Sequence, residues 1–471
     1  MEDRAPTSWF EPSAANAYRI VLIGGFLLML AANLPGHLSL DSVVALHEGR
    51  TGVRETWAPA VVSWILGRFD EVLSGTGLYV AASGALLYGS LLALRGLRPR
   101  TSWLAPAVAL AAALTPGLLI YQAIVWKDVL FANLAVAGFV LLAHAARRWP
   151  GRARIMPLAL AGLCFALAAL VRQNGAVTAV AAALALAWIA RAGGWRSSVG
   201  WGLGGLLAVV VLAAGINAAA QPDRIAPKLR PNAGMLVLQH YDIVGAAAHD
   251  PALTFDVLAR TNPAAATLLR QKAAATYSAE RVDTLDVDPA FRRALWRNPD
   301  PVMTAQWREV ITRHTGDYLA HRWAAFVQVF ATPKLDRCLP VHVGVTGPPA
   351  LLEDLDIPGV IEPQDQALGA YAARFFGTPL YSHLTYAAIA ALAAGALLWR
   401  REPADVAMAA MLLSALAFTA TFFVISVACD YRYLYFLDMA AISGLIYLAL
   451  DPAPWRRTEQ GGRPNPTRGL P

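Results

Sequence analysis

The sequence predicts an all-α polytopic membrane protein, and two observations support that prediction. Hydrophobic residues make up 57% of the 471 residues, whereas charged residues make up only 15%, and the mean hydropathy is +0.45. Several apolar runs also approach the ~20 residues that a helix needs to cross a bilayer. A soluble domain of this length would carry more charge. We therefore expect about ten transmembrane helices, in keeping with the number of these runs.

The expected spans follow from the apolar runs in chain order. They cover 18–34, 76–94, 102–120, 128–146, 155–171, 175–191, 198–216, 379–399, 405–428 and 433–450. The first run follows a charged leader and lacks a small-residue cleavage site. We therefore interpret it as an uncleaved span and not as a signal peptide.

The arginines indicate the orientation of these spans. They gather in the loops after every second span, as Arg95, Arg98, Arg100, Arg147, Arg148, Arg152, Arg154, Arg191, Arg196, Arg400, Arg401, Arg456 and Arg457. These loops share the side of the N-terminus, and basic loops stay in the cytoplasm. We expect both termini to be cytoplasmic. The net charge of +7 reflects this topology and does not indicate nucleic acid.

Four regions follow from this reading. They are an N-terminal membrane region (1–216) with an amphipathic first external loop (35–75), a small, mainly helical external insert (217–378), C-terminal transmembrane helices (379–450) and a disordered cytoplasmic tail (451–471). The insert is mixed in charge, and a helical pattern runs from Ala294 to Phe330. The tail is rich in Gly, Pro and Arg, a composition that does not form a packed core.

The three cysteines are too few for a disulfide framework. Cys164 lies in an apolar run, where packing is the expected role. Cys338 and Cys429 both fall outside the membrane, so that they could pair. The sequence leaves that pairing open.

Polar residues gather at the predicted external ends of the spans. Asp41 lies in the first loop, and further polar groups lie at 126–128, 171–175 and 429–433. Ionisable groups at the membrane are energetically costly, so we interpret them first as candidates for a functional site. Arg172 and Arg432 stand on the side where the positive-inside rule disfavours arginine. The alternative for each single group is an interfacial anchor, to which aromatic residues such as Tyr433 are suited.

Asp41 is the first carboxylate after the first span. Partial desolvation beside a bilayer is expected to raise its pKa towards the range useful for a general base. The structural alternative is that Asp41 caps a helix running from Ser42 to Glu48.

Common catalytic motifs are absent from the sequence. There is no phosphate-binding Gly-rich loop, no dinucleotide-binding turn, no zinc-type Cys/His spacing and no Gly-x-Ser-x-Gly elbow. His37, His47, His240 and His249 are too scattered to indicate a metal site.

The order and common sidedness of four short segments resemble the GT-C membrane glycosyltransferases. This superfamily includes protein O-mannosyltransferases and lipid A aminoarabinose transferases, which use sugar carried on a polyprenyl phosphate. The segments are Asp41 in the first external loop, Trp126-Lys127-Asp128, Arg172-Gln173-Asn174-Gly175 and Asp430-Tyr431-Arg432-Tyr433. Trp57-Ala58-Pro59 stands where the family more often has His-Pro. The resemblance covers the first two hundred residues well and the last fifty moderately, and it is weak over the insert.

The resemblance implies an inverting transfer from a polyprenyl-phosphate sugar to an envelope lipid, glycan or protein at the external face of a bacterial inner membrane. Asp41 would be the general base. Arg172, Arg432 and Lys127 would bind the donor phosphate, because guanidinium groups hold phosphate bidentately. Asp128, Asn174, Trp57 and Tyr433 would bind the acceptor or orient other groups, and Asp128 would either orient Lys127 or bind acceptor hydroxyls. No cofactor is required, although a divalent metal bridging Asp41 and Asp128 is compatible with the family.

Two alternatives remain open from the sequence. An envelope polysaccharide polymerase or ligase would place its arginine pair in the large loop and not beside the spans. A lipid-linked sugar flippase or transporter would place ionisable groups near the bilayer midplane and would show repeated halves. A one-sided cavity beside Asp41 would favour transfer, whereas a central pathway would favour transport.

Overall fold

A computed structural model describes residues 13–230 and 232–452 of the chain. Helices dominate these residues, and the named strands are β1 (Val53–Arg54) and β2 (Arg224–Ile225), which pair in parallel. The predicted all-α polytopic class is confirmed. Most of the tail predicted to be disordered lies outside the described residues, as do Arg456 and Arg457.

Eight helical segments of the described chain are long and apolar enough to cross a membrane. They contain the helices α1 (Ala14–Asn33), α4 (Gly77–Leu94), α7 (Lys127–Arg147), α8 (Ile155–Val171), α9 (Ala176–Ala190), α10 (Trp195–Ala219), α20 (Pro403–Ile425) and α21 (Tyr435–Leu450). A ninth span is possible if α5 (Leu104–Ala113) and α6 (Pro116–Leu119) cross together. The expected span at 379–399 corresponds to α19 (His383–Arg400), which lies outside that set and packs against α20 and α21.

The expected span at 102–120 is bent by 68° between its two halves. Helix α5 ends at Ala113, and Thr115 then caps α6, whose first residue is Pro116. Proline suits the first position of a helix because its missing N–H would have no partner there. The Thr-Pro pair therefore starts a new helix in a new direction.

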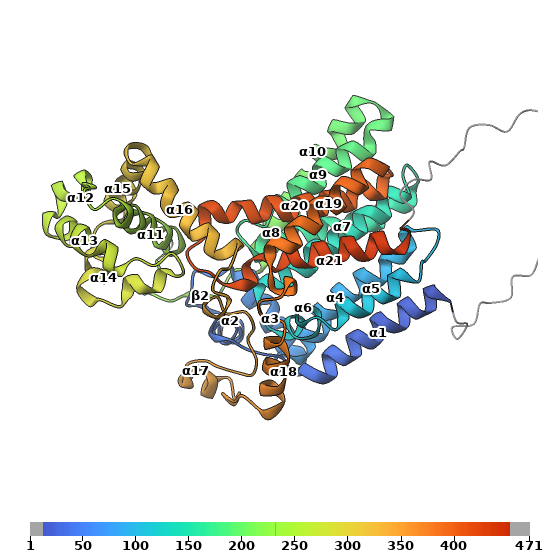
Figure 1. Cartoon of the computed structure of the whole chain (residues 1–471), viewed down its shortest axis with the longest axis horizontal. Coiled ribbons are helices and arrows are strands. Elements are labelled where there is room, and N and C mark those ends of the chain that lie inside the picture. The colour runs from blue at the N-terminus through green and yellow to red at the C-terminus, as the bar shows by residue number, and fades with distance from the viewer. Residues whose placement is uncertain (1–12, 231, 453–471) are drawn as a thin grey trace, which may run out of the picture.

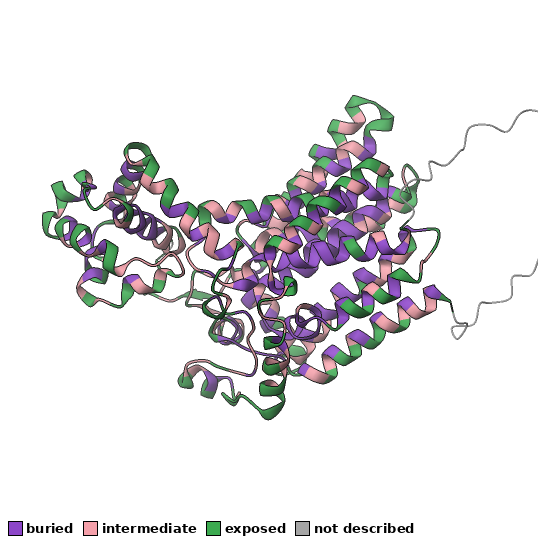
Figure 2. Cartoon of the chain, in the orientation of Figure 1, coloured by how far each residue is buried: buried purple, intermediate pink, exposed green. Residues whose placement is uncertain are grey.

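Helix α7 forms the centre of the bundle. In its most apolar window, 89% of the residues are buried, compared with 11% for α10. Helix α7 packs against α4, α8, α20 and α21, and Figure 2 shows buried residues concentrated there. The many exposed apolar side chains of α10, such as Leu203 and Leu207, suit contact with lipid.

The loops that carry the arginines meet at one end of the bundle, where α1 begins and α21 ends (Figure 1). Arg98 pairs with Asp405 and, at 3.0 Å, with Glu402. Arg400 Nε lies 3.3 Å from Asp405 Oδ2. Arg147 donates to the Gly96 carbonyl. These contacts join loops that the sequence placed on one side of the membrane.

The first part of the insert forms a lobe at the other end of the molecule (Figure 1). It comprises α11 (Ala233–His249), α12 (Asp256–Thr261), α13 (Pro263–Thr276), α14 (Pro289–Trp296), α15 (Asp300–Arg313) and α16 (Thr315–Phe330). The lobe has its own hydrophobic core, which includes Tyr241, Leu269, Phe291 and Met303. The predicted helical stretch from Ala294 to Phe330 is thus divided among three helices.

The second part of the insert returns along the membrane bundle. It contains α17 (Pro349–Asp354) and α18 (Pro363–Ala373). Helix α17 packs against α2 (Leu40–Thr51), which follows α1 in the chain. Leu352 and Leu355 join the core of the bundle there and not that of the lobe.

Candidate active site

Helix α2 carries Asp41 in the loop between the helices α1 and α4. The helix begins at Leu40, with Ser39 as its N-cap, so that Asp41 lies in the first turn and not at the cap. Ser42 Oγ donates to the Val125 carbonyl (2.7 Å). Trp126 Nε1 donates to Ser39 Oγ (2.9 Å). The start of α2 is therefore fixed to the segment that leads into α7.

A buried carboxylate shapes the loop that carries Trp57. Glu48 is 5% exposed, and its Oε1 accepts hydrogen bonds from the Glu55 and Thr56 backbone N–H groups. Its Oε2 accepts from Ser63 Oγ (2.8 Å), at the start of α3 (Ala60–Val72). Because a buried carboxylate needs such partners, Glu48 holds the Trp57 loop between α2 and α3.

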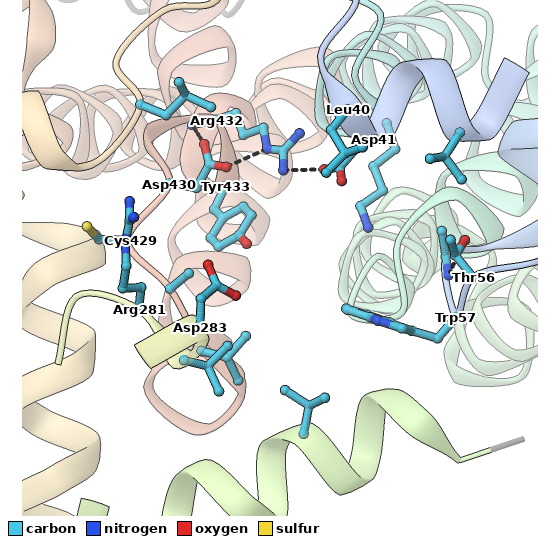
Figure 3. A pocket seen from close by; sticks show the side chains of 18 of the residues that line it. Leu40, Asp41, Thr56, Trp57, Arg281, Asp283, Cys429, Asp430, Arg432 and Tyr433 are labelled. Atoms are coloured by element: carbon cyan, nitrogen blue, oxygen red, sulfur yellow. Dashed lines mark hydrogen bonds and ion pairs between the residues drawn. The ribbon is translucent and has the colours of Figure 1, made fainter. Parts of the chain in front are cut away.

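Arg432 is the centre of an ion-paired cluster (Figure 3). It lies in the 3-10 turn η8 (Tyr431–Leu434), before α21. Its Nη2 lies 2.5 Å from Asp41 Oδ2, and its Nε lies 2.8 Å from Asp430 Oδ2. Its guanidinium carbon lies 4.7 Å from the ring centroid of Trp126. Segments from three distant parts of the chain thus meet at one guanidinium group.

Asp128 pairs with two arginines and not with Lys127. It forms an ion pair with Arg172 and lies 3.7 Å from Arg432 Nε. The expectation that Asp128 orients Lys127 is therefore wrong in this structure. Asp128 is 2% exposed, so that its carboxylate orients the two arginines from behind. As the first-turn acid of α7, it also complements the helix dipole.

Arg172 lies behind the cavity wall. Its guanidinium carbon is within 5.3–5.6 Å of the ring centroids of Phe418, Phe422 and Tyr433. Arg172 Nε donates to Asn174 Oδ1 (3.4 Å), and Asn174 donates to Thr421 Oγ1 (2.8 Å). In this structure Asn174 is therefore an orienting residue for Arg172.

Lys127 points at the same cavity from the start of α7. No ion pair engages Lys127 within residues 13–230 and 232–452. Its Nζ lies 5.6 Å from the ring centroid of Trp57, and Trp57 is 42% exposed. The ammonium group is thus available to a bound anion.

Electrostatics at Asp41 run opposite to the prediction from sequence. Burial raises the pKa of Asp41, but the charge and hydrogen bond of Arg432 outweigh burial and hold that pKa below its ordinary value. The predicted rise in pKa is wrong for this state because Arg432 could not be placed from the sequence. Asp430 behaves differently, since its burial raises its pKa in spite of the same arginine.

The cluster opens onto a cavity of about 660 Å³ between the bundle and the lobe. The bundle side contributes Asp41, Trp57, Lys127, Arg432 and Tyr433, and the lobe side contributes His240, Glu280, Arg281, Asp283, Asp286, Trp296 and Arg337. Figure 3 shows Asp41 and Trp57 on one wall and Asp283 on the opposite wall. The cavity therefore lies at the end of the bundle that faces the lobe, beside Asp41.

Backbone pairing joins the lobe wall to the Arg432 segment. Val282 N donates to the Val427 carbonyl (2.8 Å), and Cys429 N donates to the Glu280 carbonyl (2.7 Å). Cys338 and Cys429 form a disulfide, so the pairing that the sequence left open exists. Buried Arg322 donates to the Ser426 carbonyl (2.8 Å). The lobe thus holds the segment that leads into Asp430 and Arg432.

Sequence reasoning missed the residues of the lobe wall. His240, Asp283 and Trp296 lie on separate elements, and no motif marks them as neighbours. Asp430 was visible as part of the Asp-Tyr-Arg-Tyr segment, but its contact with Arg432 depends on the turn η8. The sequence does offer one signal for the lobe wall, because three of the four residues in 280–283 are charged.

The carboxylates of the cluster do not fit a bridging metal, because Asp41 and Asp128 both hold guanidinium groups. Among the described residues, the one group of three close metal-ligand side chains is Asp250, His314 and Asp317. These three lie in or beside α11 and α16 and do not line the cavity.

The fold and the site define a polytopic helical membrane protein with an ion-paired cavity between its bundle and a helical lobe. No family model and no curated relative matches the chain. Among solved structures, it is similar to the archaeal oligosaccharyltransferase AglB from Archaeoglobus fulgidus in complex with an inhibitory peptide and a dolichol-phosphate. That match has 15% identity and a TM-score of 0.39, and it covers 92% of this chain and 50% of the other. The apo form of the Archaeoglobus fulgidus oligosaccharyltransferase gives 15% identity and a TM-score of 0.41, over 94% and 51%. The chain spans about half the length of these proteins.

Proposed function

We propose that the protein is a GT-C-type membrane glycosyltransferase that moves a sugar from a polyprenyl-phosphate carrier to an envelope acceptor. The observation that supports this most directly is the cavity at the lobe end of the bundle, in which Asp41 Oδ2 and Arg432 Nη2 lie 2.5 Å apart. A carboxylate and a guanidinium on one wall supply the two functions that such a transfer needs, namely a base and a phosphate-binding group.

The donor phosphate binds Arg432 and Lys127, which both line the cavity. The cluster is balanced before the donor arrives, because Arg172, Arg432 and Lys127 give three positive charges against Asp41, Asp128 and Asp430. A phosphate that takes the outer face of Arg432 therefore competes with Asp41. Arg172 does not line the cavity and acts on Arg432 through Asp128, with which both arginines pair.

This competition prepares Asp41 for catalysis. When the phosphate neutralises Arg432, the interaction that lowers the pKa of Asp41 is weakened, and the carboxylate becomes a stronger base. The acceptor hydroxyl then attacks the anomeric carbon, and Asp41 takes its proton. The bond from the anomeric carbon to the phosphate oxygen breaks, and the phosphate leaves with the electron pair. A single displacement inverts the anomeric configuration.

The two alternatives receive less support. A polymerase or ligase would carry its arginine pair in the large loop, whereas Arg172 and Arg432 flank membrane helices. A flippase would need a polar pathway through the bundle, whereas the cavity and the ion cluster lie at its lobe end. The proposed place of the protein is a bacterial inner membrane, with the cavity on the external face and both termini in the cytoplasm.

The test is reconstitution of the purified protein in liposomes with radiolabelled decaprenyl-phosphate sugars and an envelope extract as the acceptor source. We expect label to move from the lipid to an acceptor with inverted configuration, and to stay on the lipid with Asp41→Asn. Movement of intact lipid-linked sugar across the bilayer, with no transfer of label, would establish the flippase instead.

A further inference from the structure

The lobe wall of the cavity carries polar groups that the proposed transfer does not use. Asp283 points into the cavity (Figure 3). No ion pair or hydrogen bond engages Asp283 within the part of the chain that the structure describes. The other cavity carboxylates are all engaged: Asp41 and Asp430 by Arg432, Glu280 by Arg337, and Asp286 by the indole N–H of Trp296. Asp283 is thus an exposed carboxylate that is free to accept hydrogen bonds from a ligand.

The position of Asp283 is fixed relative to Arg432. It follows directly after Val282, which donates to the Val427 carbonyl, and Arg281 forms an antiparallel bridge with Ala428. The same short pairing continues to the disulfide at Cys429. A carboxylate on this segment is therefore held at a set place opposite the phosphate-binding wall.

His240 is a second unused polar group on this wall. It is 2% exposed and lines the cavity, and both of its ring nitrogens are buried without a hydrogen-bond partner among the described residues. Burial, followed by the charge of Arg230, lowers its pKa to about 4. His240 is therefore neutral at physiological pH, with one donor and one acceptor nitrogen. Buried polar groups without partners are rare in proteins, and a ligand is one way to satisfy them.

Two tryptophans flank these polar groups. Trp296 packs edge-on against His240, with ring centroids 4.7 Å apart. Trp57 stands on the other side of the cavity, where its ring rests on Gly234 of α11. A Cβ added at Gly234 would come within 3.0 Å of Trp57 Cε3. Both rings are thus positioned by their neighbours, and both line the cavity.

We propose that Trp57, His240, Asp283 and Trp296 form the acceptor subsite, and that the acceptor they bind is a saccharide. A pyranose ring presents hydroxyl groups at its edge and C–H groups on its faces. A free carboxylate and a neutral imidazole satisfy the hydroxyl groups, and flat indole rings cover the C–H faces. An acyl chain would leave Asp283 and His240 without partners. This inference rests on the proposed transfer, because it places the acceptor opposite the donor phosphate.

The experiment measures binding to the full-length protein in nanodiscs saturated with decaprenyl phosphate, whose own binding is measured separately. The acceptor probes are mannotriose, maltotriose and chitotriose, beside a Ser/Thr-containing hexapeptide and phosphoethanolamine. We expect one trisaccharide to bind, and Asp283→Asn and Trp57→Ala each to weaken that binding at least ~10-fold, the scale of one lost charge-assisted contact. Binding of decaprenyl phosphate should not change in Asp283→Asn. Asp336→Asn, an exposed carboxylate of the same insert outside the cavity, is the matched control.

The two proposals fail in different ways. If wild-type protein binds neither decaprenyl phosphate nor polyprenyl phosphates of other chain lengths, the proposed transfer is wrong, whatever the sugars do. If it binds decaprenyl phosphate but no trisaccharide, or if Asp283→Asn and Asp336→Asn bind the trisaccharide equally well, the saccharide subsite is wrong. Binding of the hexapeptide or phosphoethanolamine that is lost in Asp283→Asn would assign the subsite to a different acceptor class.

Discussion

Arg432 Nη2 donates to Asp41 Oδ2 at 2.5 Å, although the two residues are 391 positions apart in the chain. The contact joins the loop between α1 and α4 to the turn η8 before α21. Asp41 is 61% exposed at this contact, whereas Arg432 is 10% exposed. The arginine is thus fixed by its surroundings, and the carboxylate is the partner that a ligand can displace.

The first prediction concerns Arg432. Arg432→Ala should weaken binding of decaprenyl phosphate by ~10-fold to 100-fold, because a lost charge-assisted hydrogen bond costs about 1.5–3 kcal/mol. Arg432→Lys should recover only part of the affinity, since an ammonium group cannot present two parallel donors. Equilibrium binding in nanodiscs measures both. Wild-type affinity in the alanine variant would mean that Arg432 is an interfacial anchor.

The second prediction concerns Arg172, which lies behind the cavity wall. Arg172→Ala leaves Asp128 with one arginine partner at 3.7 Å, and an unpaired buried carboxylate is costly. We expect a lower melting temperature and weaker donor binding together. Arg432→Ala should also lower the melting temperature, because it removes the ion-pair partner of Asp430, but its larger effect should be on donor binding, since Arg432 lines the cavity and Arg172 does not. Asn174→Ala should show a weaker form of the Arg172 effect, because it removes the hydrogen bond to Arg172. Thermal unfolding and donor binding of the three variants test this order.

The third prediction concerns pH. Because the folded-state pKa of Asp41 is depressed, its pair with Arg432 contributes stability that is fully present above the ordinary Asp pKa of about 3.9. That stability is lost as the pH falls through the lower folded-state pKa. The difference in melting temperature between wild type and Asp41→Asn should therefore be constant from pH 7 to 5 and should shrink towards pH 3. The same difference for Asp336→Asn is the control. A difference that grows on acidification would contradict the depressed pKa.

The fourth prediction concerns the disulfide. Removing a native disulfide costs about 2–5 kcal/mol, and Cys338–Cys429 closes a separation of 91 residues. Cys338→Ser and Cys429→Ser should lower the melting temperature, and the double variant should lower it no further than either single variant. Donor transfer should fall as well, because Cys429 belongs to the segment that leads into Arg432. Cys164→Ser is the control, since Cys164 is unpaired and buried.

The membrane fold was predictable from the sequence, because the length and polarity of each apolar run are set by the bilayer. The helix break at Thr115 and Pro116 was not predicted, although its Pro signal is local. The partner of Asp128 was misassigned for a different reason. Adjacent Lys127 suggested a pair, but the start of a helix points neighbouring side chains in different directions. The Asp283 wall depends on pairing between 280–282 and 427–429, which no local pattern encodes.

The last prediction concerns Asp41 itself. Asp41→Asn keeps the size of the side chain and removes the proton acceptor. The Asp41–Arg432 pair is exposed on the carboxylate side, and exposed pairs contribute at most about 1 kcal/mol, so the folded protein should persist. If Asp41 is the general base, transfer falls by at least ~10²-fold, the low end for such a group. Binding of decaprenyl phosphate should be equal to that of wild type or tighter, because Asp41 no longer competes for Arg432.

Asp41→Glu distinguishes a role of Asp41 as a positioned general base from a role as a negative charge that pairs with Arg432. It restores a carboxylate, but the added methylene moves that carboxylate, and a displacement of about 1 Å can cost ~10²-fold in rate. We therefore expect little recovery of transfer and near-complete recovery of the stability that the pair with Arg432 contributes at neutral pH. The measurements are initial rates of transfer in liposomes, donor binding and melting temperature, with Asp336→Asn alongside. Transfer at the wild-type rate in Asp41→Asn would show that the base lies elsewhere in the cavity. Asp283 would then be the next carboxylate to replace, because it lines the same cavity and has no ion pair or hydrogen bond among the described residues.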